Sequence, residues 1–454
     1  MKSLDIFHLP ATVVRGVTEW RYLERPGVRM RFPVLMSAHI DDICRAIRGN
    51  RTQHLNTRTV AAIVEAIDSA VTLMRRDAEA TAALLSAVTG YSQPVAADTL
   101  AHMLDDWSAD ALHALLRSEL QDARVLDQPV RDTAIANKYV AAYGFPLGCH
   151  VFSGNVPGVA VTSIIRSLLV KSATLGKTAS GEPVLPVLFA QALSQVAPGL
   201  ASCLALTYWP GGTADLDATA VANADVIVVY GGGAAVSAIA ARVSPARRLV
   251  VHGPRLSFAI AGPTAGAREA ADLARAVAAY DQQGCVSPHL VYVLGDATQA
   301  RSFAQAVAAE LEKLRETSPV GDLRTEEVIA IRNARAEAEF APGMELFGEE
   351  GSGYSVILEQ QPEFRLSCLN RLLYVKPVPS FDVIAAALPA REHLQSVGIA
   401  GFDEKAKAGL IRQLGLAGVS RITSFARLPW PPMHWHHDGA TPLQELIYWQ
   451  DIEG

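Results

Sequence analysis

Cysteine is scarce in this sequence. The chain has 5 cysteines, an odd number, and no two of them form a CxxC pair. This pattern favours neither a disulfide framework nor a structural zinc site. A reducing cytoplasm is the compartment that fits, and in that compartment a free thiol can serve as a nucleophile.

Long apolar runs and an excess of positive charge are also lacking. The chain opens with the mixed sequence Met1–Asp5, so we expect no signal peptide. The uncharged stretch Val226–Ala241 is shorter than the about 20 residues that a membrane span needs. A net charge of -6 gives no electrostatic reason to bind nucleic acid. These features predict a cytoplasmic globular protein with no membrane span and no nucleic-acid partner.

The length of 454 residues exceeds one ordinary core, so we expect two or three domains. Residues 59–67, 98–104 and 108–120 have helical apolar spacing, Ser108 is a plausible N-cap, and 29–35 resembles a short strand. The predicted organisation is a mostly helical N-terminal region at 1–130, a dinucleotide-binding domain at 131–255, a catalytic domain at 256–425 and a C-terminal tail at 426–454.

From about Cys149 the pattern alternates between strands and helices. The predicted strands cover 150–153, 174–177, 204–208, 225–230 and 248–251, and the helices between them cover 159–170, 184–196 and 234–241. The 225–230 run is almost continuously apolar, as in a strand buried on both faces. This alternation predicts a parallel α/β sheet with a nucleotide at the carboxyl ends of its strands.

A run of three glycines, Gly231, Gly232 and Gly233, follows the 225–230 strand and precedes a helix. Such a turn suits a pyrophosphate, because glycines allow close backbone approach and a helix N-terminus favours negative charge. The spacing departs from GxGxxG, since Val236 occupies the sixth position and no acidic residue follows about twenty residues later. A plain tight turn is therefore an open alternative.

Cys285 is the best candidate for a nucleophile. It lies in a connection between a helix at 265–279 and a strand at 290–294, beside Gly284, which permits close approach of another molecule. The other four have the pattern of ordinary structural cysteines: Cys203 in an apolar strand, Cys44 in an amphipathic helix, and two that flank strands, Cys149 and Cys368. His289 could act as a base, but across a proline it is better interpreted as part of a supporting wall.

Three histidines, His434, His436 and His437, crowd into four positions near the C-terminus. Zinc-binding pairs on a helix face need a wider separation than this. We therefore expect no metal, and interpret the cluster as a packed polar corner or a rim that faces the substrate.

Several motifs together resemble the aldehyde dehydrogenase superfamily. They are Phe152–Gly158, Leu169–Lys177, the strand that ends in the three glycines, and Gln283–Cys285. The resemblance implies an aldehyde-dehydrogenase-like α/β fold, with a Rossmann-type cofactor domain, an α/β catalytic domain and a helical N-terminal region.

A narrower resemblance is to the acyl-CoA reductase family, typified by the fatty-acid reductase of bacterial bioluminescence. The motifs that carry it are Thr89–Ser92, Ser153–Pro157, His252–Phe258, Asp281–Pro288, His437–Gly439 and Leu446–Trp449. They spread over most of the chain in the expected order.

The resemblance also assigns roles to individual residues. Cys285 would attack the carbonyl and Asn155 would supply an oxyanion-binding amide. Lys177 would hold the adenosine ribose and the three glycines would hold the phosphates. Ser153 and Ser180 would also lie against the cofactor.

Two positions differ from the wider superfamily. His252 stands in Val251–Pro254, where oxidising aldehyde dehydrogenases have a general-base glutamate. Ser180 stands where NAD-preferring members have an acidic residue that would repel a 2′-phosphate. The first difference favours reduction over hydrolysis, and the second leads us to expect NADPH as the cofactor.

The sequence thus predicts the NADPH-dependent reduction of an acyl thioester, carried by CoA or an acyl carrier protein, to an aldehyde. One alternative is an NAD(P)-dependent aldehyde dehydrogenase that runs toward the acid. The other is a binding subunit that keeps the fold without turnover. Acyl chain length and oligomeric state are left open, although relatives by fold usually associate into homo-oligomers.

Overall fold

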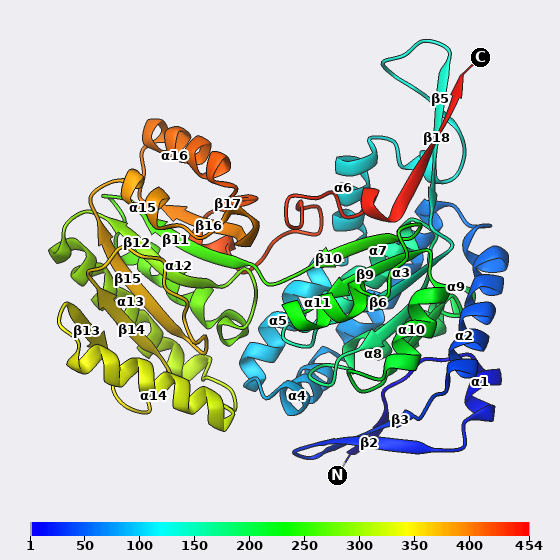
Figure 1. Ribbon diagram of the computed structural model, residues 1–454, viewed down its shortest axis with the longest axis horizontal. Helices are drawn as coiled ribbons and strands as arrows, with labels where there is room; N and C mark the ends of the chain where they lie inside the picture. Colours follow the sequence, from blue (N-terminus) through cyan, green and yellow to red (C-terminus); the bar gives the residue numbers. More distant parts are fainter. Residues whose placement is uncertain (1, 454) are drawn as a thin grey trace. The chain divides into compact units, whose positions relative to one another are not determined.

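The computed structural model describes residues 2–453, which fall into two compact units (Figure 1). Unit 1 comprises Met1–Thr89, Leu100–Gly253 and Pro432–Gly454, and unit 2 comprises Gly90–Thr99 and Pro254–Pro431. The last part of the chain thus divides after Pro431, so that Pro432 onward belongs with the N-terminal helices.

Unit 1 is centred on a parallel sheet with the strand order β10-β9-β6-β7-β8. Its strands are β6 (Leu147–Val151), β7 (Ala173–Thr178), β8 (Leu204–Tyr208), β9 (Val226–Tyr230) and β10 (Arg248–His252). Every residue of β9 is buried, which explains why its sequence is an unbroken apolar run. The predicted parallel α/β sheet is confirmed.

Helices cover this sheet. They are α2 (Ser37–Asn50), α3 (Val60–Arg76), α7 (Val159–Leu169), α8 (Leu185–Val196), α9 (Pro198–Ala201), α10 (Ala214–Asn223) and α11 (Gly233–Ala240). Ile43 and Ile47 of α2 share one core with Leu175 and Ile227 of the sheet. Helix α3 packs on α7 and α8.

The N-terminal part of unit 1 is largely helical but also holds a small sheet. The helices are α1 (Ala11–Gly16), α4 (Ala78–Thr89), α5 (Gln93–Asp106) and α6 (Ala109–Leu120), and α5 passes from unit 2 to unit 1 at Leu100. Strand β3 (Val28–Pro33) lies between β1 (Lys2–Asp5) and β2 (Trp20–Arg25). Ser108 is the N-cap of α6, but its hydroxyl donates to the Asp105 carbonyl instead of capping the helix.

The C-terminal strand returns to unit 1. Strand β18 (Ile447–Glu453) pairs antiparallel with β5 (Lys138–Gly144), which also pairs with β4 (Val130–Arg131) (Figure 1). The backbone N–H groups of Leu443 and Gln444 donate to the buried carboxylate of Glu119. These contacts attach Pro432–Gly454 to its unit.

Unit 2 is built on a second sheet, with the strand order β13-β14-β15-β12-β11-β16-β17. Its strands are β11 (Leu256–Ala261), β12 (Pro288–Leu294), β13 (Met344–Phe347), β14 (Ser355–Glu359), β15 (Leu372–Val378), β16 (Leu394–Ala400) and β17 (Arg421–Thr423). All neighbours are parallel except β13 and β14.

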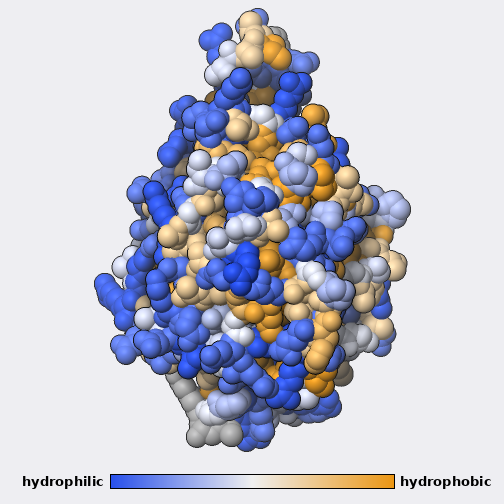
Figure 2. Space-filling model, turned by 90° about the vertical axis from the view of Figure 1, so that its left-hand side faces the viewer, coloured by the Kyte–Doolittle hydropathy of each residue, from blue (hydrophilic) through white to orange (hydrophobic). Residues whose placement is uncertain are grey.

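Two layers of helices enclose the second sheet. One apolar core contains side chains of α12 (Ala267–Ala278) and α13 (Ala297–Thr317), and the other contains those of α14 (Thr325–Phe340), α15 (Phe381–Ala387) and α16 (Glu404–Ala417). An ion pair between Arg301 and Glu345 joins α13 to β13, and one between Arg315 and Glu312 lies on the exposed surface of α13. Figure 2 shows hydrophilic and apolar side chains interspersed on the face it draws.

Short helical turns complete the chain. They are the π-helical turn η1 (Arg51–Leu55) and the 3-10 turns η2 (Ala123–Leu126), η3 (Ala279–Gln282), η4 (Arg391–His393), η5 (Phe425–Arg427) and η6 (Gln444–Leu446). Among residues 2–453, no helix combines the length and apolar character that a membrane crossing requires.

Candidate active site

Cys285 lies in unit 2, in the short loop between η3 and β12, and its side chain is exposed. Its backbone is held from both sides: Ser257 Oγ donates to the Cys285 carbonyl at 2.7 Å, and Ser287 N donates to the Gly284 carbonyl at 2.9 Å. A Cβ on Gly284 would lie 3.1 Å from Tyr280 and 3.2 Å from Ser287. Glycine therefore lets the loop pack tightly beneath the thiol.

The other four cysteines differ from Cys285 in their burial. Burial raises the pKa values of the Cys44, Cys149 and Cys203 thiols to about 12, and also raises that of Cys368. Cys203 directly precedes β8 instead of lying within the strand as predicted, because its own amide donates to the Leu200 carbonyl and closes the preceding turn. Since the thiolate is the nucleophilic form, these four are poor nucleophiles at neutral pH.

Two charged or titratable neighbours distinguish the surroundings of Cys285. Burial lowers the pKa of Arg421 to about 10, although favourable interactions with Tyr280 and Cys285 oppose this shift. Arg421 donates to the carbonyls of Leu428 and Arg427, so its guanidinium is held in place. Burial lowers the pKa of His289 to about 4, and its Nδ1 accepts from Ser367 N. His289 is thus engaged in a structural contact, which favours its interpretation as a wall residue.

The predicted cofactor residues all lie in unit 1 and follow strands of its parallel sheet. Ser153 comes after β6, as does the predicted oxyanion donor Asn155. Lys177 and Ser180 lie at and after the end of β7, and the three glycines follow β9. Because these strands are parallel and in register, their carboxyl ends form one edge of the sheet. Such an edge is where α/β sheets bind nucleotides.

The glycine turn is open to a ligand. A Cβ on Gly232 or Gly233 would meet nothing within 4 Å, and one on Gly231 would meet only Ala235. Gly233 begins α11, so free backbone N–H groups of the first helical turn are available for hydrogen bonds to phosphate. This geometry fits the diphosphate of a dinucleotide.

Lys177 is buried and paired within its own unit. Its Nζ lies 2.8 Å from Oδ1 of Asp217, which also accepts from Trp209 Nε1 at 2.9 Å. The Lys177 ammonium lies 5.1 Å from the centre of the Trp209 ring. The pairing fixes the lysine at the sheet edge where the resemblance places a ribose.

A cationic side chain contacts the backbone of Ser180. Arg25 Nη2 donates to the Ser180 carbonyl at 3.1 Å. Glu182 is nearby in sequence, but it turns inward and accepts from the backbone N–H groups of Val184 and Leu185 at the start of α8. Burial raises the pKa of Glu182 to about 7.

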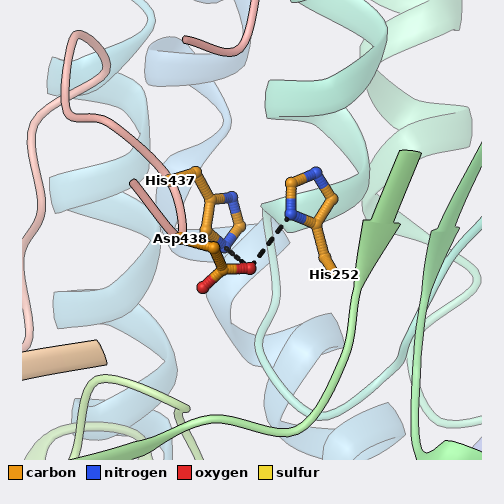
Figure 3. Close-up of side chains that lie close together, drawn as sticks. All are labelled: His252, His437 and Asp438. Carbon is orange, nitrogen blue, oxygen red and sulfur yellow. Dashed lines mark hydrogen bonds and ion pairs between the residues drawn. The ribbon is translucent and has the colours of Figure 1, made fainter. Parts of the chain in front are cut away.

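His252, His437 and Asp438 come together in unit 1 (Figure 3). Nδ1 of His252 lies 3.4 Å and Nε2 of His437 4.0 Å from the same oxygen of Asp438. The two imidazole rings are stacked, with centroids 4.2 Å apart and planes within 15°. Tyr230 and Trp435 extend this stack on its two sides.

These three residues form a group that could hold a metal ion, since their donor atoms lie within 4.8 Å of one another. Imidazole lone pairs lie in the ring plane, so two nearly parallel, stacked rings cannot both direct a lone pair at one ion unless one ring turns. The arrangement is better suited to a long hydrogen bond between His252 and Asp438, by which the carboxylate orients the imidazole. The contact between His252 and Asp438 could not be predicted from local spacing, because the two residues are 186 positions apart in the chain.

The structure thus gathers the predicted cofactor residues at one sheet edge of unit 1 and places Cys285 in unit 2. The sequence did not indicate a role for Arg421 or the pairing of His252 with Asp438. It also did not indicate the buried ion pair of Asp281, four residues before Cys285, with Arg371. Asp281 had a signal, since it belongs to the Asp281–Pro288 motif. Arg371 and Arg421 had none in their local sequence.

Comparisons with known proteins bear on this site. A model of the acyl-CoA reductase (LuxC) family matches residues 55–449. The chain belongs to the acyl-CoA reductase (LuxC) family. As a member of this family it is an oxidoreductase, and the predicted family resemblance is confirmed.

A long-chain acyl-protein thioester reductase of Photobacterium leiognathi is 26% identical over 368 residues, which cover 79% of this chain and 74% of that protein. Among solved structures, the NADP-dependent glyceraldehyde-3-phosphate dehydrogenase of Bacillus halodurans, complexed with NADP, matches with a TM-score of 0.74 and 14% identity over 96% of this chain and 95% of that one. The NAD-dependent benzaldehyde dehydrogenase of Corynebacterium glutamicum has the same TM-score and identity, covering 96% of each chain. The predicted aldehyde-dehydrogenase-like fold is confirmed.

Proposed function

We propose that this acyl-CoA reductase family member reduces an acyl thioester, carried by CoA or an acyl carrier protein, to an aldehyde through an acyl-enzyme on Cys285. The observation that carries the proposal is the exposed Cys285 thiol, in a chain whose other thiols have pKa values raised by burial. The relative from Photobacterium leiognathi, named for long-chain acyl-protein thioesters, supports the substrate class.

The chemistry begins with the Cys285 thiolate. It attacks the thioester carbonyl, the bond from that carbon to the carrier sulfur breaks, and the departing thiolate takes up a proton. On this proposal the Asn155 amide and the Cys285 backbone N–H donate to the oxygen while it carries negative charge. The acyl group then remains on Cys285 as a thioester.

The cofactor we propose is NADPH, bound by the glycines 231–233, Lys177, Ser153 and Ser180. When bound, the reduced nicotinamide would supply a hydride to the acyl carbon. The bond from that carbon to the Cys285 sulfur then breaks, which releases the aldehyde and returns Cys285 as the thiolate. The open glycine turn fits a diphosphate. Arg25 beside Ser180, together with the inward turn of Glu182, favours a cofactor with a 2′-phosphate over one without it.

One observation favours a second candidate function, the oxidation of an aldehyde to the acid. The pairing of His252 with Asp438 resembles the way a carboxylate orients a histidine that acts as a base. A base of this kind could activate water against an acyl-enzyme. The two functions differ in what happens to the acyl group when no reduced cofactor is present.

The test is product analysis after an acyl-CoA is incubated with the enzyme in the absence of NADPH. We expect the acyl-enzyme to persist and to release little free acid, because water is a poor nucleophile without an efficient base. His252→Glu should increase acid release, since it places a carboxylate where oxidising aldehyde dehydrogenases have a general base. His434→Glu is the control, because His434 lies outside the His252–Asp438 group, and it should leave acid release unchanged. Rapid stoichiometric acid release by the wild type would place aldehyde oxidation first.

A further inference from the structure

The backbone just before Cys285 is strained. Tyr280, Asp281 and Gln282 have φ values of 54°, 46° and 64°, in the left-handed region that non-glycine residues avoid. Such conformations persist only where the surrounding structure imposes them, and they are frequent at functional sites. All three residues are buried.

A second strained segment holds the first. Leu369, Asn370 and Arg371 have φ values of 66°, 54° and 63°. Asn370 N donates to the Asp281 carbonyl at 3.1 Å. The Gln282 side-chain amide donates to the carbonyls of Leu372 and Pro288, at 2.9 and 2.7 Å. The two segments are thus joined through both main chain and side chains.

A buried ion pair joins the segments at their centre. Nε of Arg371 donates to Oδ1 of Asp281 at 2.8 Å, and the two side chains are 3% and 5% exposed. Arg371 also donates to the Ser318 and Pro319 carbonyls, and the second Asp281 oxygen accepts from Gly321 N. We call this ion pair the Asp281–Arg371 clasp.

The clasp is close to the nucleophile in the chain, since Asp281 lies in the strained turn four residues before Cys285. Tyr280, in the strained turn, donates its hydroxyl proton to the Pro429 carbonyl, and a Cβ at position 284 would lie only 3.1 Å from its ring. The orientation of the turn therefore determines where the next residue, Cys285, presents its thiol. A reacting group must be held within about 0.5 Å of its productive geometry.

We propose that Asp281 and Arg371 are positioning residues for Cys285: the clasp maintains the strained turn so that the thiol is presented in one orientation. This inference rests on the proposed function, because it assigns the clasp a role in acylation. It goes beyond that function in assigning a role to a buried ion pair, that of Asp281 with Arg371.

The test compares three variants of the full chain. Asp281→Asn removes one charge and leaves Arg371 buried without its partner. The double variant Asp281→Asn/Arg371→Met removes both charges, which commonly restores stability to a buried pair. Glu359→Gln is the matched control. It breaks another buried ion pair of the same unit, in which Lys376 Nζ lies 2.6 Å from Oε2 of Glu359.

Two rates are measured for the folded fraction of each variant, as determined by thermal unfolding. One is the acylation of Cys285 by octanoyl-CoA, followed by mass, and the other is its alkylation by iodoacetamide. We expect acylation by both clasp variants to be slower on the order of 10²-fold, the usual effect of a small misplacement. Alkylation should change less, because a small reagent accepts many thiol orientations. Glu359→Gln should acylate at the wild-type rate.

A merely structural role would give a different result. If the double variant is stable and acylates as fast as the wild type, or if Glu359→Gln slows acylation equally, the positioning role is wrong while the proposed function stands. If the wild type is not acylated on Cys285 at all, the proposed function fails and this inference fails with it. Slow acylation by a stable double variant supports the clasp.

Discussion

Units 1 and 2 position their proposed functional residues in different ways. In unit 1 the proposed cofactor residues follow β6, β7 and β9 within a few positions, so the parallel sheet itself brings them to one edge. In unit 2 the turn before Cys285 contains Asp281, whose buried partner Arg371 is 90 positions away. A dinucleotide needs an open backbone edge, whereas a nucleophile needs a fixed orientation, and the second requirement calls for long-range contacts.

The largest effect is expected at the nucleophile of unit 2. Cys285→Ala should abolish both acylation and aldehyde formation, because no other described thiol is fully exposed. The control is Cys203→Ala, which removes a buried thiol and should reduce stability at most. Mass analysis after mixing with an acyl-CoA measures the first effect and thermal unfolding the second. Full activity of Cys285→Ala would exclude the covalent mechanism.

The next effect tests whether unit 1 also contributes to the chemistry. Asn155→Ala should slow turnover by about 10²–10³, the usual loss when one oxyanion donor is removed. Asn155 is exposed in the loop after β6, so stability should change little. Val156→Ala in the same loop is the control. Aldehyde formation at saturating substrate is the measurement, and wild-type turnover by Asn155→Ala would confine the chemistry to unit 2.

The same contrast explains what could be predicted from the sequence. Strand β9, helix α7 and the glycine turn have local signals, because a buried parallel strand is continuously apolar and a phosphate turn needs glycine. Cys285 is proposed as the nucleophile from its motif and its position beside Gly284. These signals lie within a few residues of the feature they report.

Contacts between distant segments leave no such local signal. In the sequence, Arg371 is an ordinary arginine before a strand, and only the fold shows that it pairs with Asp281. Asp438 belongs to a motif in the histidine-rich C-terminal part of the sequence, but nothing there predicts its pairing with His252. The pairing of Lys177 with Asp217 likewise depends on α10 being adjacent to the sheet. One sequence supplies no information about which of its charges become partners.

An effect of intermediate size is expected from Arg421, the cation that interacts with Cys285 in unit 2. The positive charge of Arg421 interacts favourably with Cys285, so it should favour the thiolate. Arg421→Met should raise the pH at which iodoacetamide alkylates Cys285 by about one unit, and slow alkylation at neutral pH about tenfold. The variant and the wild type should converge at high pH, where the Cys285 thiol is fully ionised in both.

Arg421→Lys provides the control for this charge effect. It keeps the positive charge, so its pH profile should stay near that of the wild type, although lysine cannot reproduce both hydrogen bonds to the Leu428 and Arg427 carbonyls. Identical profiles for Arg421→Met and the wild type would show that the thiol is activated by another group.

The smallest effect concerns cofactor choice in unit 1. The 2′-phosphate of NADPH is expected near Ser180, where Arg25 donates to the backbone and Glu182 is turned inward. Ser180→Glu places a carboxylate there, which should repel the phosphate and shift kcat/KM toward NADH by about tenfold, on the order of one lost charge interaction. Ser180→Ala should change the ratio little, and Arg25→Gln should shift it in the same direction as Ser180→Glu but less, because Arg25 is only half-buried and its charge is partly screened by salt. The measurement is kcat/KM for each cofactor at one salt concentration.

A wild type that uses NADH much better than NADPH would mean that the Lys177–Asp217 pair, with its carboxylate beside the proposed ribose site, determines the preference instead of Ser180.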